Sequence, residues 1–232
     1  MILNWEQLPE SMRSDSVRPY YETLKKKQSG LYMKRGLDFL FAFVLTVVLS
    51  PVMAGVALWI KLDSRGPVFY RQERITRYGK PYRIFKFRTM VNGADKKGPL
   101  VTEKQDSRIT RAGQTLRRCR LDELPQLLNI LRGEMSFVGT RPEVRKYVAQ
   151  YTGEMHATLL LPAGVTSRTS ILFKDEDVLL EKYQKETGKT VDQVYVEYIL
   201  PVKMKYNLQY LKQFSFFGDI KVMFETVLAV LK

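Results

Sequence analysis

Apolar residues are concentrated in one long run near the start of the chain. Residues 39–60, FLFAFVLTVVLSPVMAGVALWI, contain no charged side chain. At about 1.5 Å per residue, a helix over this run would be about 33 Å long, close to the thickness of the hydrocarbon core of a bilayer. A buried helix of a soluble protein is not expected to be so long and so uniformly apolar. The pattern therefore predicts a segment that inserts into a membrane.

Ser50 and Pro51 interrupt this run near its middle. Proline removes one helical donor and clashes with the carbonyl four residues earlier, and the serine hydroxyl can bond a nearby backbone carbonyl. The pair predicts a turning point between two arms, 39–49 and 52–60, each about half a bilayer long.

The charges around the run bear on its topology. Basic residues flank both of its sides: Lys25, Lys26, Lys27, Lys34, Arg35, Lys61, Arg65, Arg71 and Arg74. A crossing would carry basic residues to the outside, against the usual bias toward the cytoplasm. The flanks therefore favour a re-entrant helix with both ends cytoplasmic. A kinked single span is the alternative, because membrane helices tolerate proline.

The rest of the chain has shorter periodic segments. VFYRQERI and YRIFKFR, within 64–90, alternate in polarity around the turn-like YGKP and predict a β-hairpin. Residues 91–107 are expected to form a loop. Helical patterns are expected over 115–120, 124–131 (with Pro125 in its first turn and Gly133 after its end), 144–160, 178–188 and parts of 191–231.

These segments predict a mostly α-helical chain with a small β-hairpin. We expect an N-terminal cytoplasmic extension over 1–33, a membrane helix-break-helix over 34–63, and a compact, membrane-associated catalytic domain over 64–232. The apolar stripe of the last helix is open to two interpretations, ordinary core packing or an amphipathic helix that lies on the membrane interface.

The charge balance narrows the class of partner. Lys and Arg total 38 against 24 Asp and Glu, a formal net charge of +14. Such an excess favours an anionic partner: nucleic acid, an anionic membrane face or a phosphorylated ligand. The one cysteine, Cys119, excludes an internal disulfide.

The first candidate for chemistry is the pair Asp122 and Glu123, which follows Arg117, Arg118 and Arg120 at the expected start of a helix. Carboxylates can hold a hard cation such as Mg²⁺, and an aspartate can attack phosphorus. Arginines can neutralise charge on phosphoryl oxygens. The alternative is a helix cap followed by a solvated first-turn acid.

Further candidates lie on either side of this pair. Arg141, fixed between Thr140 and Pro142 in VGTRPE, can hold a phosphate or belong to a structural turn. Lys86 and Arg88 can reach a substrate or be solvated hairpin residues. Basic residues interleaved with aromatics in 69–88 also suit nucleic acid, which the membrane segment disfavours.

Taken in order, these segments resemble the bacterial monotopic phosphoglycosyl transferases, also called bacterial sugar transferases. The resemblance is carried by KRGLDFLFAFVLTVVLSPVM, GPVFYRQERITRYGKPYRIFKFRTM and DSRITRAGQTLRRCRLDELPQLLNILRGEMSFVGTRPE, and more loosely by SFFGDIKVMFETV. It implies transfer of a sugar phosphate from a UDP-sugar to polyprenyl phosphate, with release of UMP, as the first membrane step of surface glycan assembly.

The resemblance also implies roles for residues. Asp122 would be the nucleophile of a covalent phosphosugar intermediate, and Glu123 would coordinate Mg²⁺ with it. Arg117 would bind the polyprenyl phosphate and Arg141 a substrate phosphate. The Ser50-Pro51 pair would bend a re-entrant helix, with the protein on the cytoplasmic face of the bacterial inner membrane.

The expected partners are then polyprenyl phosphate, a UDP-sugar and the lipid bilayer, with no nucleic acid. A second copy of the chain and downstream glycosyltransferases are further partners that this role admits. Departures from the family pattern at Thr140, Ala163–Ser167 and Asn207 leave the sugar open, and Arg168–Asp177 is the segment expected to read it. The alternative function is a non-enzymatic basic membrane adaptor.

Overall fold

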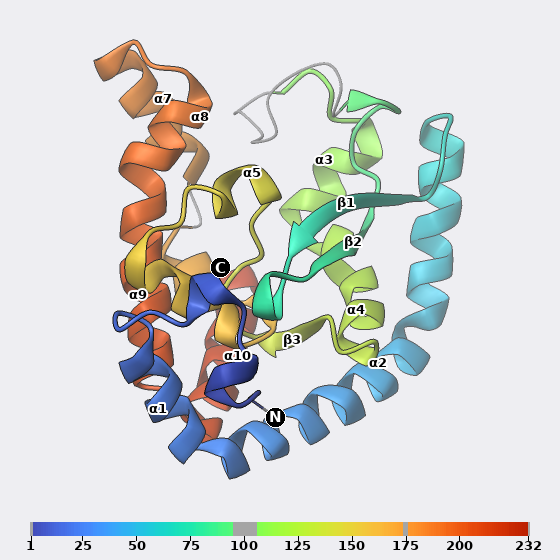
Figure 1. Ribbon diagram of the computed structural model, residues 1–232. Helices are drawn as coiled ribbons and strands as arrows, with labels where there is room; N and C mark the ends of the chain where they lie inside the picture. Colours follow the sequence, from blue (N-terminus) through green and yellow to red (C-terminus); the bar gives the residue numbers. More distant parts are fainter. Residues whose placement is uncertain (1, 95–105, 174–175, 232) are drawn as a thin grey trace.

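The apolar run forms a single helix, α2 (Gln28–Asp63), in the computed structural model of the chain, which describes residues 2–94, 106–173 and 176–231. The expected break is instead a bend. Figure 1 shows α2 running across the base of the molecule and then turning to rise along its side. Pro51 lies inside the continuous helix, and Ser50 Oγ donates a hydrogen bond to the carbonyl of Val47 (2.7 Å). A proline removes only one donor, so the helix bends without ending.

Most of the α2 surface is not covered by the rest of the protein. Phe43 and Val48 are 55% and 63% exposed, whereas Ala42 in the first part and Ile60 in the second are buried. Each part therefore packs one narrow stripe against the domain. The helix is long and apolar enough to cross a membrane.

The predicted hairpin is confirmed. Strands β1 (Phe69–Ile75) and β2 (Pro81–Phe87) are antiparallel, with Phe69 opposite Phe87 and Ile75 opposite Pro81. The YGKP segment overlaps a short turn of 3-10 helix, Arg77–Gly79, in which Tyr78 and Gly79 both have positive φ. Period-two alternation sets the register, so Tyr70 and Lys86 point to the same face of the hairpin.

Short elements follow the hairpin. Helix α3 (Arg111–Arg118) starts earlier than the sequence predicts, because Thr110 Oγ1 accepts a hydrogen bond from the Gly113 amide (3.0 Å) and caps it. A 3-10 helix, Leu121–Gln126, leads into α4 (Leu127–Leu131), which ends before Gly133 in the left-handed region. Of the loop expected over 91–107, residues 95–105 lie outside the described residues.

Two elements differ from the predictions. The helix expected over 144–160 is wrong: α5 (Arg145–Val148) and a 3-10 helix, Gly153–Leu160, replace it, because Gly153 adopts φ +47° between them. Ala163–Thr166 forms strand β4, parallel to β3 (Met135–Val138), which the sequence analysis did not predict. The two strands approach closely, since a Cβ on Gly164 would meet the Gly139 amide nitrogen at 2.2 Å.

The C-terminal half is helical, and the helix predicted over 178–188 is confirmed. Its helices are α6 (Arg168–Leu172), α7 (Glu176–Thr187), α8 (Val191–Val194), a π-helical turn over Tyr195–Ile199, α9 (Leu200–Lys212) and α10 (Phe216–Leu231).

The N-terminal segment packs against this half. Helix α1 (Arg18–Lys26) lies beside α9 (Figure 1), and Tyr20 OH donates a hydrogen bond to Glu154 (2.5 Å). Met12, Val17 and Leu24 are almost completely buried in a cluster shared with α8 and α9. The first residues of the chain thus form part of the main core.

Candidate active site

The two adjacent carboxylates lie at the start of the 3-10 helix that follows α3. Arg120, the residue before this helix, adopts the left-handed conformation with φ +56°. A side chain in this region costs about 1–3 kcal/mol, and such residues concentrate at functional sites. Asp122 is buried, and Glu123 is partly exposed.

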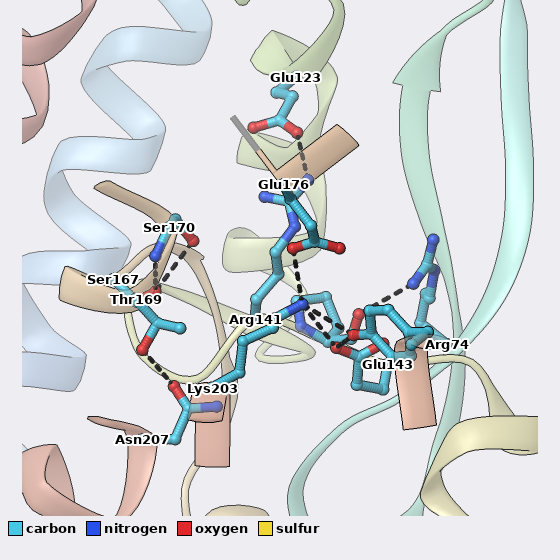
Figure 2. A network of polar contacts seen from close by, with 12 residues as sticks. Arg74, Glu123, Arg141, Glu143, Ser167, Thr169, Ser170, Glu176, Lys203 and Asn207 are labelled. Carbon is cyan, nitrogen blue, oxygen red and sulfur yellow. Dashed lines mark hydrogen bonds and ion pairs between the residues drawn. The ribbon is translucent and has the colours of Figure 1, made fainter. Parts of the chain in front are cut away.

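Two of the predicted cations meet Glu123. Lys86 Nζ, from β2, lies 2.7 Å from Glu123 Oε1, and Arg141 Nη2, from the loop after β3, lies 3.3 Å from the same oxygen. Figure 2 shows Arg141 extending toward Glu123 from below. Three segments distant in sequence therefore meet at one carboxylate, as the sequence analysis placed them together in function.

Arg88 has different contacts from Lys86. Its guanidinium donates to the carbonyls of Arg65 (2.5 Å) and Ser64 (2.7 Å), just past the C-terminal end of α2. Gly66, at φ +132°, leaves room for it, since a Cβ there would meet Arg88 Nη1 at 2.0 Å. Arg88 thus ties the end of α2 to the hairpin, and its charged end does not meet the two carboxylates.

A cavity of about 1800 Å³ connects these residues. Its polar wall contains the carboxylate pair and the predicted cations: Lys86, Arg88, Arg117, Asp122, Glu123 and Arg141. Its apolar wall contains Leu45 and Leu49 of α2, with Leu127, Phe137 and Val165. Leu49, Leu127, Phe137 and Val165 pack in one cluster, so the apolar wall is continuous. The cavity can take a ligand with both a charged and an apolar part.

The two carboxyls titrate in opposite directions. Burial raises the pKa of Asp122, as does the charge of Glu123, while Lys86 lowers it. Burial also acts to raise the pKa of Glu123, but Lys86 and Arg141 outweigh it and hold that pKa far below its usual range. Neighbouring acids whose pKa values are pushed apart are typical of catalytic pairs.

The charge of Glu123 raises the pKa of Arg141 above its usual value despite burial. Arg141 therefore stays a cation and Glu123 an anion across the physiological range, whereas Asp122 gains a proton more readily than an ordinary aspartate. The pair thus combines a fixed negative charge with a second carboxyl whose ionisation depends on its surroundings.

Behind Arg141 lies a polar cluster that the sequence analysis did not assign. Lys203 of α9 contacts Glu143, Glu176 and the Tyr195 hydroxyl, and all of these residues line the cavity (Figure 2). Glu143 was part of the VGTRPE motif but received no role. Lys203 stands among the buried apolar residues Leu200, Met204 and Leu208, and a charge at such a position was the signal available.

The carboxylates can also be compared with the requirements of a metal. Among the described residues, no group of three or more His, Cys, Asp or Glu side chains is arranged to hold an ion. Mg²⁺ commonly uses one or two carboxylates together with water and substrate phosphates. Asp122 and Glu123, adjacent on the cavity wall, fit that smaller donor set.

The chain was then compared with known proteins. It is 32% identical over 204 residues to the UDP-N-acetylgalactosamine-undecaprenyl-phosphate N-acetylgalactosaminephosphotransferase of Aeromonas hydrophila, which covers 86% of this chain and 44% of that protein. It is 34% identical over 222 residues to the UDP-glucose:undecaprenyl-phosphate glucose-1-phosphate transferase of Escherichia coli strain K12, covering 94% of this chain and 44% of the relative.

A third relative is closer in length. The UDP-glucose:undecaprenyl-phosphate glucose-1-phosphate transferase of Caulobacter vibrioides is 34% identical over 203 residues, covering 85% of this chain and 69% of that protein. The chain spans less than half the length of the first two relatives. The family described as bacterial sugar transferase matches residues 29–232, which include α2, the hairpin and the whole cavity wall. The chain therefore belongs to the bacterial sugar transferase family.

Proposed function

We propose that the protein transfers a sugar phosphate from a UDP-sugar to polyprenyl phosphate and releases UMP. One observation carries the proposal: a single cavity joins the carboxylate pair and its cations to an apolar wall contributed by the membrane-type helix α2. The charged part suits a nucleotide diphosphate and a lipid phosphate. The apolar part suits a prenyl chain. The names of the relatives, which specify undecaprenyl phosphate and a sugar phosphotransfer, agree with it.

The proposed reaction has two displacements at Asp122. In the first, a carboxylate oxygen of Asp122 attacks the phosphorus bonded to the sugar. The bond to the bridging oxygen breaks, and UMP leaves with that electron pair. In the second, an oxygen of polyprenyl phosphate attacks the same phosphorus and breaks its bond to Asp122. The products are polyprenyl-diphosphate-sugar and the free carboxylate.

The surrounding residues would supply charge and position, which are most of what phosphoryl transfer requires. Arg141 and Lys86 would neutralise the phosphoryl oxygens, and Glu123 would keep both cations in place. Arg117, in the last turn of α3 on the same cavity wall, would bind the lipid phosphate. Asp122 and Glu123 would hold Mg²⁺, which supplies Lewis-acid polarisation of phosphate oxygens when bound.

The half-reactions can be measured separately. Detergent-solubilised protein with a UDP-sugar and Mg²⁺ alone should release no more than one UMP per site, and polyprenyl phosphate should make release continuous. A panel of UDP-sugars identifies the donor. Absence of UMP release with every donor and acceptor, while the protein binds lipid vesicles whether or not Asp122 and Glu123 are intact, would favour the adaptor function.

We also propose that α2 is re-entrant and keeps both of its ends at the cytoplasmic face, where UDP-sugars occur. The bend at its middle and the basic residues on both flanks support this topology. Single cysteines near Asn4 and Lys80, in a Cys119→Ser background, should both resist an impermeant thiol reagent in intact cells. Labelling at one end only would indicate a spanning helix.

A further inference from the structure

Lys203 is a buried charge in the middle of α9. Its side chain is 5% exposed, and its Nζ lies 2.8 Å from Tyr195 OH, 3.1 Å from Glu176 Oε2 and 3.3 Å from Glu143 Oε1. Tyr195 OH also donates to Glu143 Oε1 (2.5 Å). A lysine is buried at a considerable cost in solvation, and one that is retained needs partners such as these.

Glu143 and Glu176 both lie close to Arg141 as well. Their charges add to that of Glu123 in raising the pKa of Arg141, so three carboxylates act on one guanidinium. Within the described ranges, however, Arg141 forms an ion pair with Glu123 only. Figure 2 shows the carboxylates of Glu143 and Glu176 directed toward Lys203. Lys203 thus binds the two acids that would otherwise compete for Arg141.

We propose that Lys203 is a positioning residue that keeps Arg141 available for an anionic substrate. This inference rests on the proposed function, in which Arg141 binds a substrate phosphate. Without Lys203, Glu176 would lose its cation, and Arg141 would be the nearest replacement. A carboxylate paired with Arg141 would exclude a phosphate from it by occupying its donors and cancelling its charge. Glu143 would still be held by Tyr195 OH.

The test begins with Lys203→Met and a matched control. Lys203→Met should raise the KM for the UDP-sugar about tenfold and change kcat less than about threefold, since a lost charge contact of this size affects binding first. Lys205→Met, the same change at an exposed position of α9, should leave both constants unchanged. Circular dichroism and thermal unfolding establish that each variant is folded.

The deciding measurement is a second substitution. If Glu176 is the residue that blocks Arg141, then Lys203→Met/Glu176→Gln should return KM to within about threefold of the wild-type value. A purely structural lysine predicts no such rescue, because the double variant loses a further contact. Rescue in KM without a matching change in unfolding temperature supports the positioning role.

Other outcomes overturn the inference. Equal KM values for Lys203→Met and wild type would do so, and so would a double variant as impaired as the single one. Lys203→Gln is made in parallel, because it keeps hydrogen bonds without the charge and should show the same rise in KM. Failure of both single variants to fold would make Lys203 a folding residue and would refute the assignment. A wild-type protein without UMP release would instead refute the proposed function.

Discussion

The two walls of the cavity are built in different ways. The polar wall is assembled from short, separate elements: Lys86 from β2, Glu123 from a 3-10 helix and Arg141 from a loop. The apolar wall rests on one long regular helix, which supplies Leu45 and Leu49 one turn apart. Irregular backbone such as that of Arg120 can bring charges from distant segments together, whereas a helix presents a repeated surface.

The difference suggests a division of labour. Changes in the polar wall should affect the reaction of the phosphorus itself, and changes in the apolar wall should affect only the lipid acceptor. A substitution that failed to respect this division would show that the walls act as one unit. The four predictions below test it in order of decreasing expected effect.

The largest effect is expected for Asp122→Asn. An amide cannot form the covalent intermediate, so UMP release should fall about a thousandfold or more. Stability should not fall with it, because burial already disfavours the ionised carboxyl and an amide has no charge to desolvate. UMP release and thermal unfolding are the measurements, and Asp15→Asn, at an exposed position, is the control. Retained turnover would refute Asp122 as the nucleophile.

Lys86→Met should reduce kcat/KM about 10- to 100-fold at neutral pH, because a cation facing the phosphoryl group is lost. It should also change the pH profile. Asp122 attacks only when ionised, so activity is lost as the pH falls through its pKa. Lys86 lowers that pKa, so its removal should move the acid limb of kcat/KM to higher pH. Lys80→Met, on the same hairpin, should move neither. An unshifted acid limb would separate it from Asp122.

The apolar wall is tested by Leu45→Ser/Leu49→Ser. This pair should raise the KM for a long polyprenyl phosphate about tenfold, since two apolar contacts worth about 1.5–3 kcal/mol each are weakened. The single UMP released from the donor alone should be unchanged. Val44→Ser/Val48→Ser makes a matched change on the same helix at exposed positions that do not line the cavity. Equal effects of the two pairs would mean that α2 acts only as an anchor.

The smallest effect on activity is expected on α10. Phe224 and Leu228 are 68% and 59% exposed and lie one turn apart, as a helix on a membrane interface requires. Phe224→Ser/Leu228→Ser should weaken binding to lipid vesicles several-fold while kcat in detergent micelles stays the same. Unchanged vesicle binding would mean that α2 alone holds the protein on the bilayer.

The sequence predicted well what depends on local pattern. The apolar run of α2, the alternation of the hairpin and the helix ending near Gly188 all follow from periodicity and from residues with strong backbone preferences. The meeting of Lys86, Glu123 and Arg141 was predicted from motif order, which the resemblance to the family supplied.

What the sequence did not predict depends on contacts between distant segments. The β3–β4 pair is only a few residues long and forms because Gly139 and Gly164 allow two backbones to approach. The role of Arg88 depends on where α2 ends, and that of Lys203 on the packing of α9 against the loop after β3. No local pattern encodes such neighbours, although a lysine among buried apolar residues marks a position to examine.

The burial of the N-terminal segment has a practical consequence. The family match begins at residue 29, and that position invites a shortened chain for expression. Met12, Val17 and Leu24 lie before it and fill the core beside α9, the helix that carries Lys203. A chain trimmed at the family boundary would leave an open apolar trough along that helix. The unit of evolution that the family describes is therefore shorter than the unit that folds.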